Sequence, residues 1–429
     1  MDMTYDETVQ YLFNCAPPFQ QVGGAAYKEG LATSIELDNH LGNPHRKFRT
    51  IHVAGTNGKG STSHTIAAIL QESGYKVGLY TSPHLIDFRE RMRVNGKPAS
   101  KEYVVDFVES HKKFFEPLCP SFFELTTAMA FNYFAEQEVD VAVIEVGLGG
   151  RLDCTNIIIP ELCIITNISF DHTQFLGSTL QEIAGEKAGI IKPGIPAVIG
   201  ETTPETREVF ENRANSCGAP LTFAEEDIEV IAATATENGY TYSTRSYGTL
   251  HGGLGGYCQE KNTSTILAAI KLLKEKGFAI TPDAVHKGFA DVCPITGLMG
   301  RWQKIQENPR VVCDAGHNIG GIRYVSEQLA AQRCRTLRIV FGMVSDKDIS
   351  AVLDLMPKNA TYYFTQASIK RAMPAAELKE KAAGYSLNGE CYPTVGEALA
   401  SAIHDSDKED FIFVGGSCFI VADLLQDME

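Results

Sequence analysis

Between residues 49 and 200 the apolar residues fall into short continuous runs, and the segments between these runs are amphipathic. A strand that is apolar at consecutive positions is buried on both faces, which is typical of a parallel sheet covered by helices. The pattern therefore predicts an α/β domain with a mainly parallel, P-loop-type sheet and flanking helices. The expected strands are residues 50–54, 76–82, 139–147, 162–168 and 195–200, and the expected helices are residues 62–76, 101–115, 123–137 and 180–190.

Residues 228–247 differ from this pattern, because polar and apolar residues alternate along them. Alternation around a turn at Glu237, Asn238 and Gly239 predicts an antiparallel hairpin. Helices are expected to follow over residues 262–276 and 282–291. The first domain is thus predicted to contain a small antiparallel portion.

A second alternation of strands and helices begins after residue 302. Residues 291–302 before it contain one proline and two glycines without clear periodicity, which predicts an irregular linker. We place the boundary there, between a domain of residues 1–296 and a smaller Rossmann-like α/β domain of residues 297–429. The expected elements of the second domain are strands at 310–316, 337–343, 361–366 and 411–416, and helices at 322–331, 375–383 and 396–403.

Composition narrows the class of protein and its compartment. The chain has 429 residues, of which 44% are hydrophobic and 21% charged, and its formal net charge is −15. An acidic surface disfavours nonspecific binding to nucleic acid, so no nucleic-acid partner is expected. Eleven cysteines occur without a C-x-x-C pair, and neither a signal-peptide pattern nor a membrane-length apolar run is seen. These features indicate a cytoplasmic protein with reduced thiols and no membrane partner.

The segment HVAGTNGKGS, residues 52–61, lies between an expected buried strand and an expected helix. Its glycines allow a tight turn whose N–H groups can surround one anion. Lys59 adds a positive charge and the helix start adds a partial one, so the segment predicts a nucleotide phosphate site. A glycine-rich turn that only caps the helix is the alternative. The candidate nucleotide-binding residues are Gly55, Thr56, Asn57, Gly58, Lys59, Gly60 and Ser61.

Polar residues also follow the next three expected strands, at residues 81–84, 145–156 and 167–177. Because parallel strands end at the same edge of a sheet, these segments are expected to lie together. Glu145 lies in an apolar strand, where a carboxylate is costly unless a cation pairs with it. Beside a phosphate that cation is Mg²⁺, and a nearby Lys or Arg is the alternative. His172 is either a metal ligand or a hydrogen-bonded structural residue.

Further candidates lie outside these segments. Lys187 is on an expected helix that returns beneath the same edge, and a solvated surface lysine is the alternative. In the second domain Asp314 and His317 end the first expected strand and Arg301 precedes it, with capping as the alternative role for Arg301. If the strand ends of the two domains face each other, the active site lies in the interdomain cleft.

Six motifs, in the order HVAGTNGKGS, TSPHL, EVGLGGRLD, NISFDHTQFLG, GEKAGIIKPG and DAGHN, resemble the folylpolyglutamate synthase and dihydrofolate synthase branch of the Mur ligase family. The resemblance extends over roughly residues 20–425. It also accounts for Gly60, which stands where the common P-loop pattern has a hydroxyl residue.

The resemblance implies an ATP-dependent amide ligase. ATP would phosphorylate a substrate carboxylate to an acyl phosphate, and the amine of L-glutamate would displace the phosphate. The carboxylate would belong to dihydropteroate or to the glutamate tail of a reduced folate. Members of this family are usually monomers, so a monomer is expected.

The resemblance also implies roles for single residues. Ser82, Glu145 and His172 match its Mg²⁺ positions, and Lys187 matches a lysine carried as a carbamate that would hold a second Mg²⁺ ion. The candidate catalytic residues are Lys59, His172 and Lys187. The positions matching ATP contacts are Asn262, Arg301, Asp314 and His317, and those matching substrate contacts are Ser82, Ser121, Phe122, Phe123, Glu124, Leu152, Asp153, Cys154 and Ser417.

One motif departs from the family pattern. Its members commonly carry G-x-H-Q before the asparagine on the adenine side, whereas residues 256–259 here read G-Y-C-Q, although Gln259 and Asn262 keep their spacing. Two other functions stay open at this point. One is a Mur-type ligase that joins an amino acid to a non-folate carboxylate, and the other is a nonenzymatic module in which ATP only drives domain closure.

Overall fold

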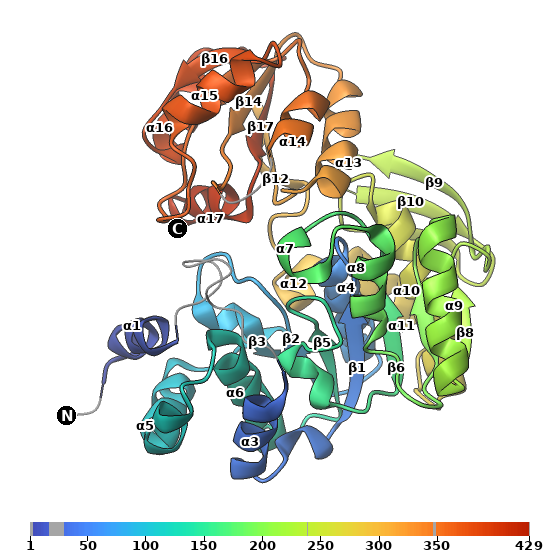
Figure 1. Cartoon of the computed structure of the whole chain (residues 1–429). Coiled ribbons are helices and arrows are strands. Elements are labelled where there is room, and N and C mark those ends of the chain that lie inside the picture. Colours follow the sequence, from blue (N-terminus) through green and yellow to red (C-terminus); the bar gives the residue numbers. More distant parts are fainter. Residues whose placement is uncertain (1–2, 17–29, 238, 346–348, 429) are drawn as a thin grey trace. The chain divides into compact units, whose positions relative to one another are not determined.

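The computed structural model describes residues 3–16, 30–237, 239–345 and 349–428. The chain divides into two compact units (Figure 1). The first contains residues 1–234, 240–253 and 259–298, and the second contains residues 235–239, 254–258 and 299–429.

The first unit is built on an eight-stranded sheet with the strand order β4-β3-β2-β5-β1-β6-β7-β8. All five expected strands are present. The last six strands in this order, β2-β5-β1-β6-β7-β8, pair in parallel. The antiparallel pair β3–β4 at one edge was not expected, and neither was the short strand β8. The bounds are β1 Arg49–Ala54, β2 Val77–Tyr80, β3 Met92–Val94, β4 Lys97–Pro98, β5 Val141–Glu145, β6 Leu162–Ile165, β7 Ala197–Ile199 and β8 Leu221–Phe223.

Helices cover both faces of this sheet, which explains why its strands are apolar at every position. In β5, Ala142 and Ile144 belong to a core formed with α5 and α6, whereas α4 packs against β5 and β2. The bounds of the longer helices are α1 Tyr5–Cys15, α3 Ala32–His40, α4 Lys59–Glu72, α5 Lys101–Leu118, α6 Phe122–Glu136, α8 Leu180–Ala188, α9 Pro204–Cys217, α10 Gln259–Glu275 and α11 Pro282–Ala290. The short ones are η2 Pro44–Arg46, η3 Phe88–Arg91, η4 Cys154–Ile157, α7 Thr173–Leu176 and α12 Val292–Thr296.

The linker prediction for residues 291–302 is wrong in one part, because α12 occupies residues 292–296. Pro294 is the third residue of this helix. The first turn of a helix has no intrahelical acceptors for its N–H groups, so a proline there loses no hydrogen bond. The helix ends at Gly297, whose φ of 72° suits a left-handed C-cap.

The expected hairpin is present as strands β9 Val230–Thr236 and β10 Gly239–Thr244, while Asn238 of its predicted turn lies outside the described residues. A third strand, β11 Gly248–Gly252, pairs antiparallel with β10. The resulting three-stranded sheet has the order β11-β10-β9. It is the small antiparallel portion that the alternating pattern predicted.

The second unit contains a six-stranded sheet with the order β12-β13-β17-β14-β15-β16. Only β12 pairs antiparallel, and the four expected strands pair in parallel, as a Rossmann-like domain requires. The strands are β12 Gln303–Gln306, β13 Arg310–Asp314, β14 Leu337–Phe341, β15 Thr361–Phe364, β16 Asn388–Cys391 and β17 Phe411–Gly415. The helices are α13 Ile319–Ala330, α14 Ser350–Leu355, α15 Ala375–Ala383, α16 Val395–His404 and α17 Cys418–Gln426.

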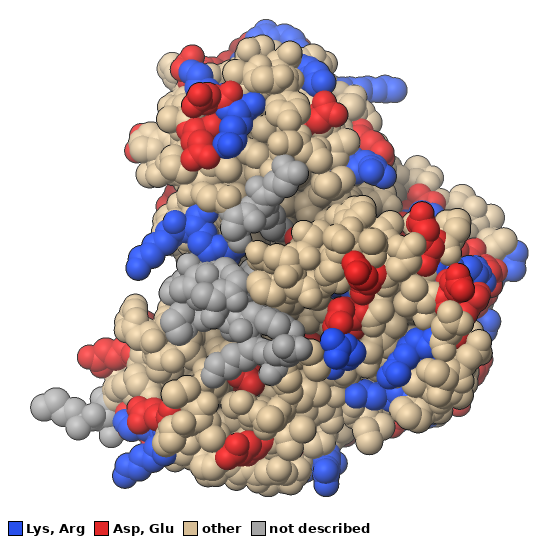
Figure 2. Space-filling model, viewed as in Figure 1, with Lys and Arg blue, Asp and Glu red and all other residues tan. Residues whose placement is uncertain are grey.

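Two further observations concern the charges on the surface and the polarity of the helices. On the face shown in Figure 2, Lys and Arg side chains are interspersed with Asp and Glu. Among the helices that the structure describes, none is both long enough and apolar enough to cross a bilayer.

Candidate active site

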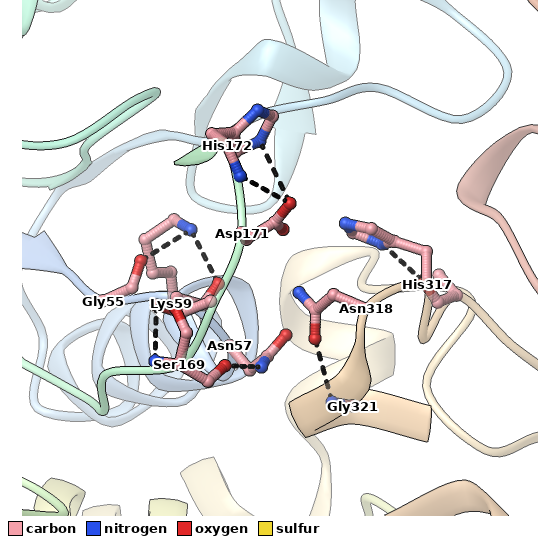
Figure 3. Close-up of polar contacts among 11 residues, drawn as sticks. Gly55, Asn57, Lys59, Ser169, Asp171, His172, His317, Asn318 and Gly321 are labelled. Carbon is pink, nitrogen blue, oxygen red and sulfur yellow. Dashed lines mark hydrogen bonds and ion pairs between the residues drawn. The ribbon is translucent and has the colours of Figure 1, made fainter. Parts of the chain in front are cut away.

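The turn between β1 and α4, residues 55–58, is the predicted phosphate loop of the site. Gly58 has a φ of 81° and is the N-cap of α4, so Lys59 is the first residue of the helix. A Cβ at Gly58 would strike the side-chain amide of Asn262, which explains the glycine at this position. The Lys59 ammonium donates to the carbonyl oxygens of Gly55 at 3.0 Å and Thr56 at 3.2 Å (Figure 3). A lysine and a helix N-terminus at one turn form an anion site.

The chain that follows β6 holds the phosphate loop in place. The Thr56 N–H donates to the Asn167 carbonyl at 3.0 Å, and the Asn57 N–H donates to Asn167 Oδ1 at 2.9 Å. The Thr166 hydroxyl donates to the Asn57 carbonyl at 2.5 Å, and the Asn57 amide donates to Ser169 Oγ at 3.3 Å. These contacts arise because β6 pairs directly with β1. Asn167 and Ser169 lie in a segment that the sequence marked as polar, but their role in supporting the loop was not predicted.

A second support comes from α10. Gln259 donates to Ser61 Oγ at 3.3 Å, and Asn262 donates to Gln259 Oε1 at 3.0 Å. All three side chains are buried. The structure thus brings the predicted residue Asn262 to the phosphate loop and gives Gln259 a role in positioning it.

Two of the three predicted metal positions lie within hydrogen-bond distance of each other. Glu145 is the last residue of β5 and is only 3% exposed, and its Oε2 accepts from the Ser82 N–H at 3.3 Å. His172 has a φ of 51°, and its N–H donates to Asp171 Oδ1 at 3.0 Å (Figure 3). Its Nε2 lies 3.9 Å from the same carboxylate.

The donor set of Ser82 and Glu145 fits a hard cation. Hydroxyl and carboxylate oxygens are the ligands that Mg²⁺ prefers, usually together with phosphate oxygens and water. No group of three or more His, Cys, Asp and Glu side chains within the described ranges has the geometry of a complete metal cage. The site therefore suits an ion that takes part of its coordination from a nucleotide.

Lys187 is buried in α8, with a relative exposure of 4%, so the solvated-lysine alternative is wrong. Burial and the charge of Lys59 lower its pKa from the ordinary 10.5 to about 7, although the carboxylates of Asp171 and Asp153 oppose this shift. A buried ammonium is costly, and a neighbouring positive charge adds to that cost. Near neutral pH the side chain is thus available as a neutral amine.

The turn after β5 brings together three residues that were predicted to lie near the substrate. Asp153 is buried, and its carboxylate accepts from the Leu148 N–H at 2.8 Å and from the Thr155 N–H at 3.0 Å. Burial raises the pKa of Asp153, although these hydrogen bonds oppose the rise. Leu152 is half-buried, and burial raises the pKa of the Cys154 thiol well above its usual range.

The predicted substrate positions 121–124 form the first turn of α6. Ser121 Oγ accepts from the Glu124 N–H at 3.2 Å, and the Glu124 carboxylate accepts from the Ser121 N–H at 2.7 Å. This reciprocal pair is a capping box, so both residues stabilise the start of the helix. Phe122 is buried, and the ring centroid of Phe123 lies 5.7 Å from that of Tyr80.

In the second unit, Asp314 ends β13 and organises the chain around it. Its carboxylate accepts from the Trp302 N–H and from the Gly316 N–H, each at 2.8 Å. Burial raises the pKa of Asp314, whereas the positive charge of Arg301 opposes the rise. The Arg301 guanidinium also donates to the Gly300 carbonyl at 3.1 Å. The structure thus places Arg301 and Asp314 in one local cluster.

The two remaining predicted residues of this unit also have local contacts. His317 Nδ1 lies 3.0 Å from the Ala315 carbonyl oxygen (Figure 3). Ser417 is the N-cap of α17 and accepts from the Ile420 N–H at 3.3 Å. His317 and Ser417 follow the neighbouring strands β13 and β17, so both lie at the carboxyl ends of strands in this sheet.

A parallel sheet with a glycine-rich turn after β1, a buried glutamate at the end of β5 and a buried lysine in α8, followed by a Rossmann-like domain, fits an ATP-dependent ligase of the Mur type. Family comparison supports this class. Residues 53–270 match the Mur ligase middle domain, and residues 300–418 match the Mur ligase glutamate ligase domain.

Within that class, the chain belongs to the dihydrofolate synthase/folylpolyglutamate synthase family. It is 35% identical over 411 residues to the dihydrofolate synthase/folylpolyglutamate synthase of Bacillus subtilis, covering 92% of this chain and 94% of the relative. It is 34% identical over 378 residues to the Escherichia coli protein of the same name, covering 87% and 85%. The predicted family, fold class and enzyme class are thereby confirmed.

Solved structures agree with this assignment. Escherichia coli FolC in complex with DHPP and ADP matches 99% of this chain and 98% of its own, with 31% identity and a TM-score of 0.84. A bifunctional folylpolyglutamate synthase/dihydrofolate synthase with Mn, AMPPNP and L-glutamate bound also matches 99% and 98%, with 29% identity and a TM-score of 0.81.

Proposed function

We propose that this enzyme joins L-glutamate to dihydropteroate and to the glutamate tail of reduced folates, with ATP converted to ADP and phosphate. The observation that carries the proposal is the buried Lys187 beside Lys59 of the phosphate loop. A nonenzymatic nucleotide module needs no uncharged amine beside its phosphate lysine. ADP, AMPPNP, Mn and L-glutamate bound to homologous structures support the same reaction class.

The phosphate-transfer step is mainly a problem of charge and alignment. A substrate carboxylate oxygen attacks the γ-phosphorus of ATP, the bond to the bridging β–γ oxygen breaks, and ADP leaves. Lys59 and the N–H groups at the start of α4 offset the repulsion between carboxylate and triphosphate. Ser82, Glu145 and His172 would hold Mg²⁺, which when bound neutralises phosphate charge.

The amide-forming step follows on the acyl phosphate. The α-amine of L-glutamate attacks the acyl carbon, the carbon–oxygen bond to phosphate breaks, and the amine loses a proton. The residues at 121–124 and 152–154 are proposed to receive the pterin-bearing acceptor, with Ser417 as a further substrate residue. Asn262, Arg301, Asp314 and His317 are proposed to contact ATP.

Lys187 is proposed to act as a carbamate. Its neutral amine attacks the carbon of CO₂, a nitrogen–carbon bond forms and one proton is released, which leaves an anionic oxygen donor. That donor would hold a second Mg²⁺ ion. The lowered pKa of Lys187 supports this proposal, because only the unprotonated amine reacts with CO₂.

The proposal is tested by measuring ADP release from the purified enzyme with L-glutamate and either dihydropteroate or tetrahydrofolate. Both acceptors are expected to stimulate ATP turnover. Stimulation by dihydropteroate alone would restrict the function to dihydrofolate synthase. If neither acceptor stimulates turnover, the folate assignment is wrong and a non-folate carboxylate is the substrate.

Two further parts of the proposal have their own tests. Lys187→Ala is expected to remove most turnover while circular dichroism stays unchanged, with the exposed Lys113→Ala as a control of similar chemistry. Normal turnover in Lys187→Ala would refute a role for this amine. The enzyme is also proposed to act as a cytoplasmic monomer, for which light scattering gives the mass and cell fractionation the compartment.

A further inference from the structure

We propose that Thr155 and His52 are positioning residues that hold the acceptor loop, residues 147–154, through a buried hydrogen-bond chain ending on Asp153. The inference rests on the proposed function, because the acceptor loop includes Leu152, Asp153 and Cys154. It assigns to two residues outside that set a specific effect on acceptor binding.

The chain of hydrogen bonds runs from the central strand of the sheet to the loop. His52 in β1 and Thr155 in η4 are both 0% exposed, and Asp153 is 5% exposed. His52 Nε2 lies 2.8 Å from Thr155 Oγ1, and Thr155 Oγ1 lies 2.5 Å from Asp153 Oδ1. Three buried polar side chains from two distant parts of the sequence are thus connected.

The donors and acceptors of the three groups give this hydrogen-bond chain one direction, from His52 to Asp153. The single hydroxyl proton of Thr155 is donated to Asp153 Oδ1. The Thr155 oxygen must then accept from His52, which fixes the imidazole as the tautomer protonated on Nε2. His52 Nδ1 is left as a buried nitrogen without a hydrogen-bond partner among the described residues. Burial lowers the pKa of His52 to about 3, so the imidazole stays neutral at physiological pH.

Asp153 in turn determines the shape of the acceptor loop. Its second oxygen, Oδ2, accepts from the Leu148 N–H at 2.8 Å, and Oδ1 accepts from the Thr155 N–H at 3.0 Å. Backbone N–H groups therefore occupy both oxygens of the carboxylate. Rotation of Asp153 about its side-chain bonds would break several of these hydrogen bonds at once. The Thr155 hydroxyl resists that rotation because it holds Oδ1.

The same loop contacts the other proposed acceptor segment. A Cβ on Gly147 would overlap the ring of Phe123, so the loop backbone lies directly against that ring. A shift of the loop backbone at Gly147 would therefore also displace the Phe123 ring. The phosphate loop has its own support from residues 166–169. Loss of the hydrogen-bond chain is therefore expected to weaken acceptor binding more than ATP binding.

The test compares Thr155→Val, which keeps the shape and removes the hydroxyl, with Thr155→Ser, which keeps the hydroxyl. Thr155→Val is expected to raise the KM for dihydropteroate about tenfold, in line with a lost hydrogen bond to a charged group. The KM for ATP is expected to change less than about twofold, and Thr155→Ser is expected to restore acceptor binding. Equal changes in both KM values, or a Thr155→Ser variant as impaired as Thr155→Val, would overturn the inference.

A matched control removes a buried threonine hydroxyl elsewhere in the same unit. Thr244 is 5% exposed, and its hydroxyl donates to the Gly248 carbonyl at 2.9 Å in the antiparallel sheet. Thr244→Val is expected to lower stability without changing the ratio of the two KM values. His52→Leu removes the donor to Thr155 and is expected to shift that ratio in the same direction as Thr155→Val. An unchanged ratio in His52→Leu would remove His52 from the proposal.

A second readout separates this inference from the proposed function. Hydrogen exchange of the Leu148 and Thr155 N–H groups is measured in wild type, Thr155→Val and Thr155→Ser. Faster exchange only in Thr155→Val supports the positioning role, even if no folate acceptor stimulates the wild-type enzyme. If exchange is faster only in Thr155→Val and no folate acceptor stimulates the wild type, the substrate assignment is wrong but the positioning role stands. Unchanged exchange in Thr155→Val overturns the positioning role, even if the folate activity is confirmed.

Discussion

The lowered pKa of Lys187 leads to a quantitative prediction about reactivation of the enzyme by CO₂. The rate of carbamate formation is proportional to the fraction of neutral amine at a fixed concentration of dissolved CO₂. With a pKa of about 7 for Lys187, the neutral fraction is about a tenth at pH 6, about a half at pH 7 and about nine-tenths at pH 8. An ordinary lysine would be neutral only to about 0.03% at pH 7, and its neutral fraction would grow about tenfold per pH unit.

The assay first removes CO₂ at low pH and then follows recovery of ADP release after a pulse of dissolved CO₂. The rate of recovery is expected to rise about fivefold between pH 6 and 7 and less than about twofold between pH 7 and 8. The sign follows from the protonation state, because lower pH converts the reactive amine to ammonium. Lys187→Met should show no recovery, and ¹³C-labelled CO₂ should give a carbamate signal only in the wild type.

Either of two results would refute this reasoning. A recovery rate that keeps rising tenfold per pH unit above pH 8 would mean that burial and Lys59 do not lower the pKa of Lys187. Activity that is insensitive to CO₂ removal, without a carbamate signal, would mean that the amine acts unmodified. The first result contradicts the lowered pKa of Lys187, and the second contradicts only the proposed carbamate.

Three other variants test separate parts of the structure. Glu145→Gln should raise the Mg²⁺ concentration needed for half-maximal ADP release and lower turnover at least about a hundredfold, and an unchanged Mg²⁺ titration would count against the metal assignment. Gly58→Ala should raise the KM for ATP because its Cβ would strike Asn262, whereas Gly74→Ala, which has a similar φ of 88° and open space around it, should only lower stability. Phe134→Ala empties a fully buried position and should lower the free energy of unfolding in urea by about 3–5 kcal/mol, so near-normal stability would contradict the assigned core.

Much of the fold follows from local pattern, and the exceptions have physical causes. Nine strands of the two large sheets were predicted because continuous apolar runs require burial on two faces, whereas the short strands β3, β4, β8, β12 and β16 were not. Helix α17 was not predicted, because residues 418–426 are apolar at most positions and lack a polar face that would reveal a helical period. The cap at Ser417 and the φ of 99° at Gly416 mark its start in the structure. The predicted start of α4 was three residues too late, since the left-handed turn at Gly58 lets the helix begin at Lys59.

The chemical character of the site was visible in the sequence to a similar extent. The order of polar segments after the strands of the first domain predicted that phosphate, metal and lysine groups would share one edge of the sheet. The structure joins Ser82 to Glu145, which end neighbouring segments in this order. It also brings Asn262 to Gly58, a contact that the order of segments did not predict. Capping by Ser121, Glu124 and Ser417 was not predicted, because the same residue types serve equally well as substrate contacts.

The sequence by itself determined the class of this protein, because the phosphate loop and the order of its motifs are local features. Only the tertiary structure decided the pKa values and the buried hydrogen bonds of the site. The pKa of Lys187 depends on its burial and on Lys59, which is more than a hundred residues away in the chain. The path from His52 through Thr155 to Asp153 likewise exists only because β1 packs beside the turn that follows β5. Hydration and electrostatic interactions act through space, so these properties appear only when distant segments are folded together.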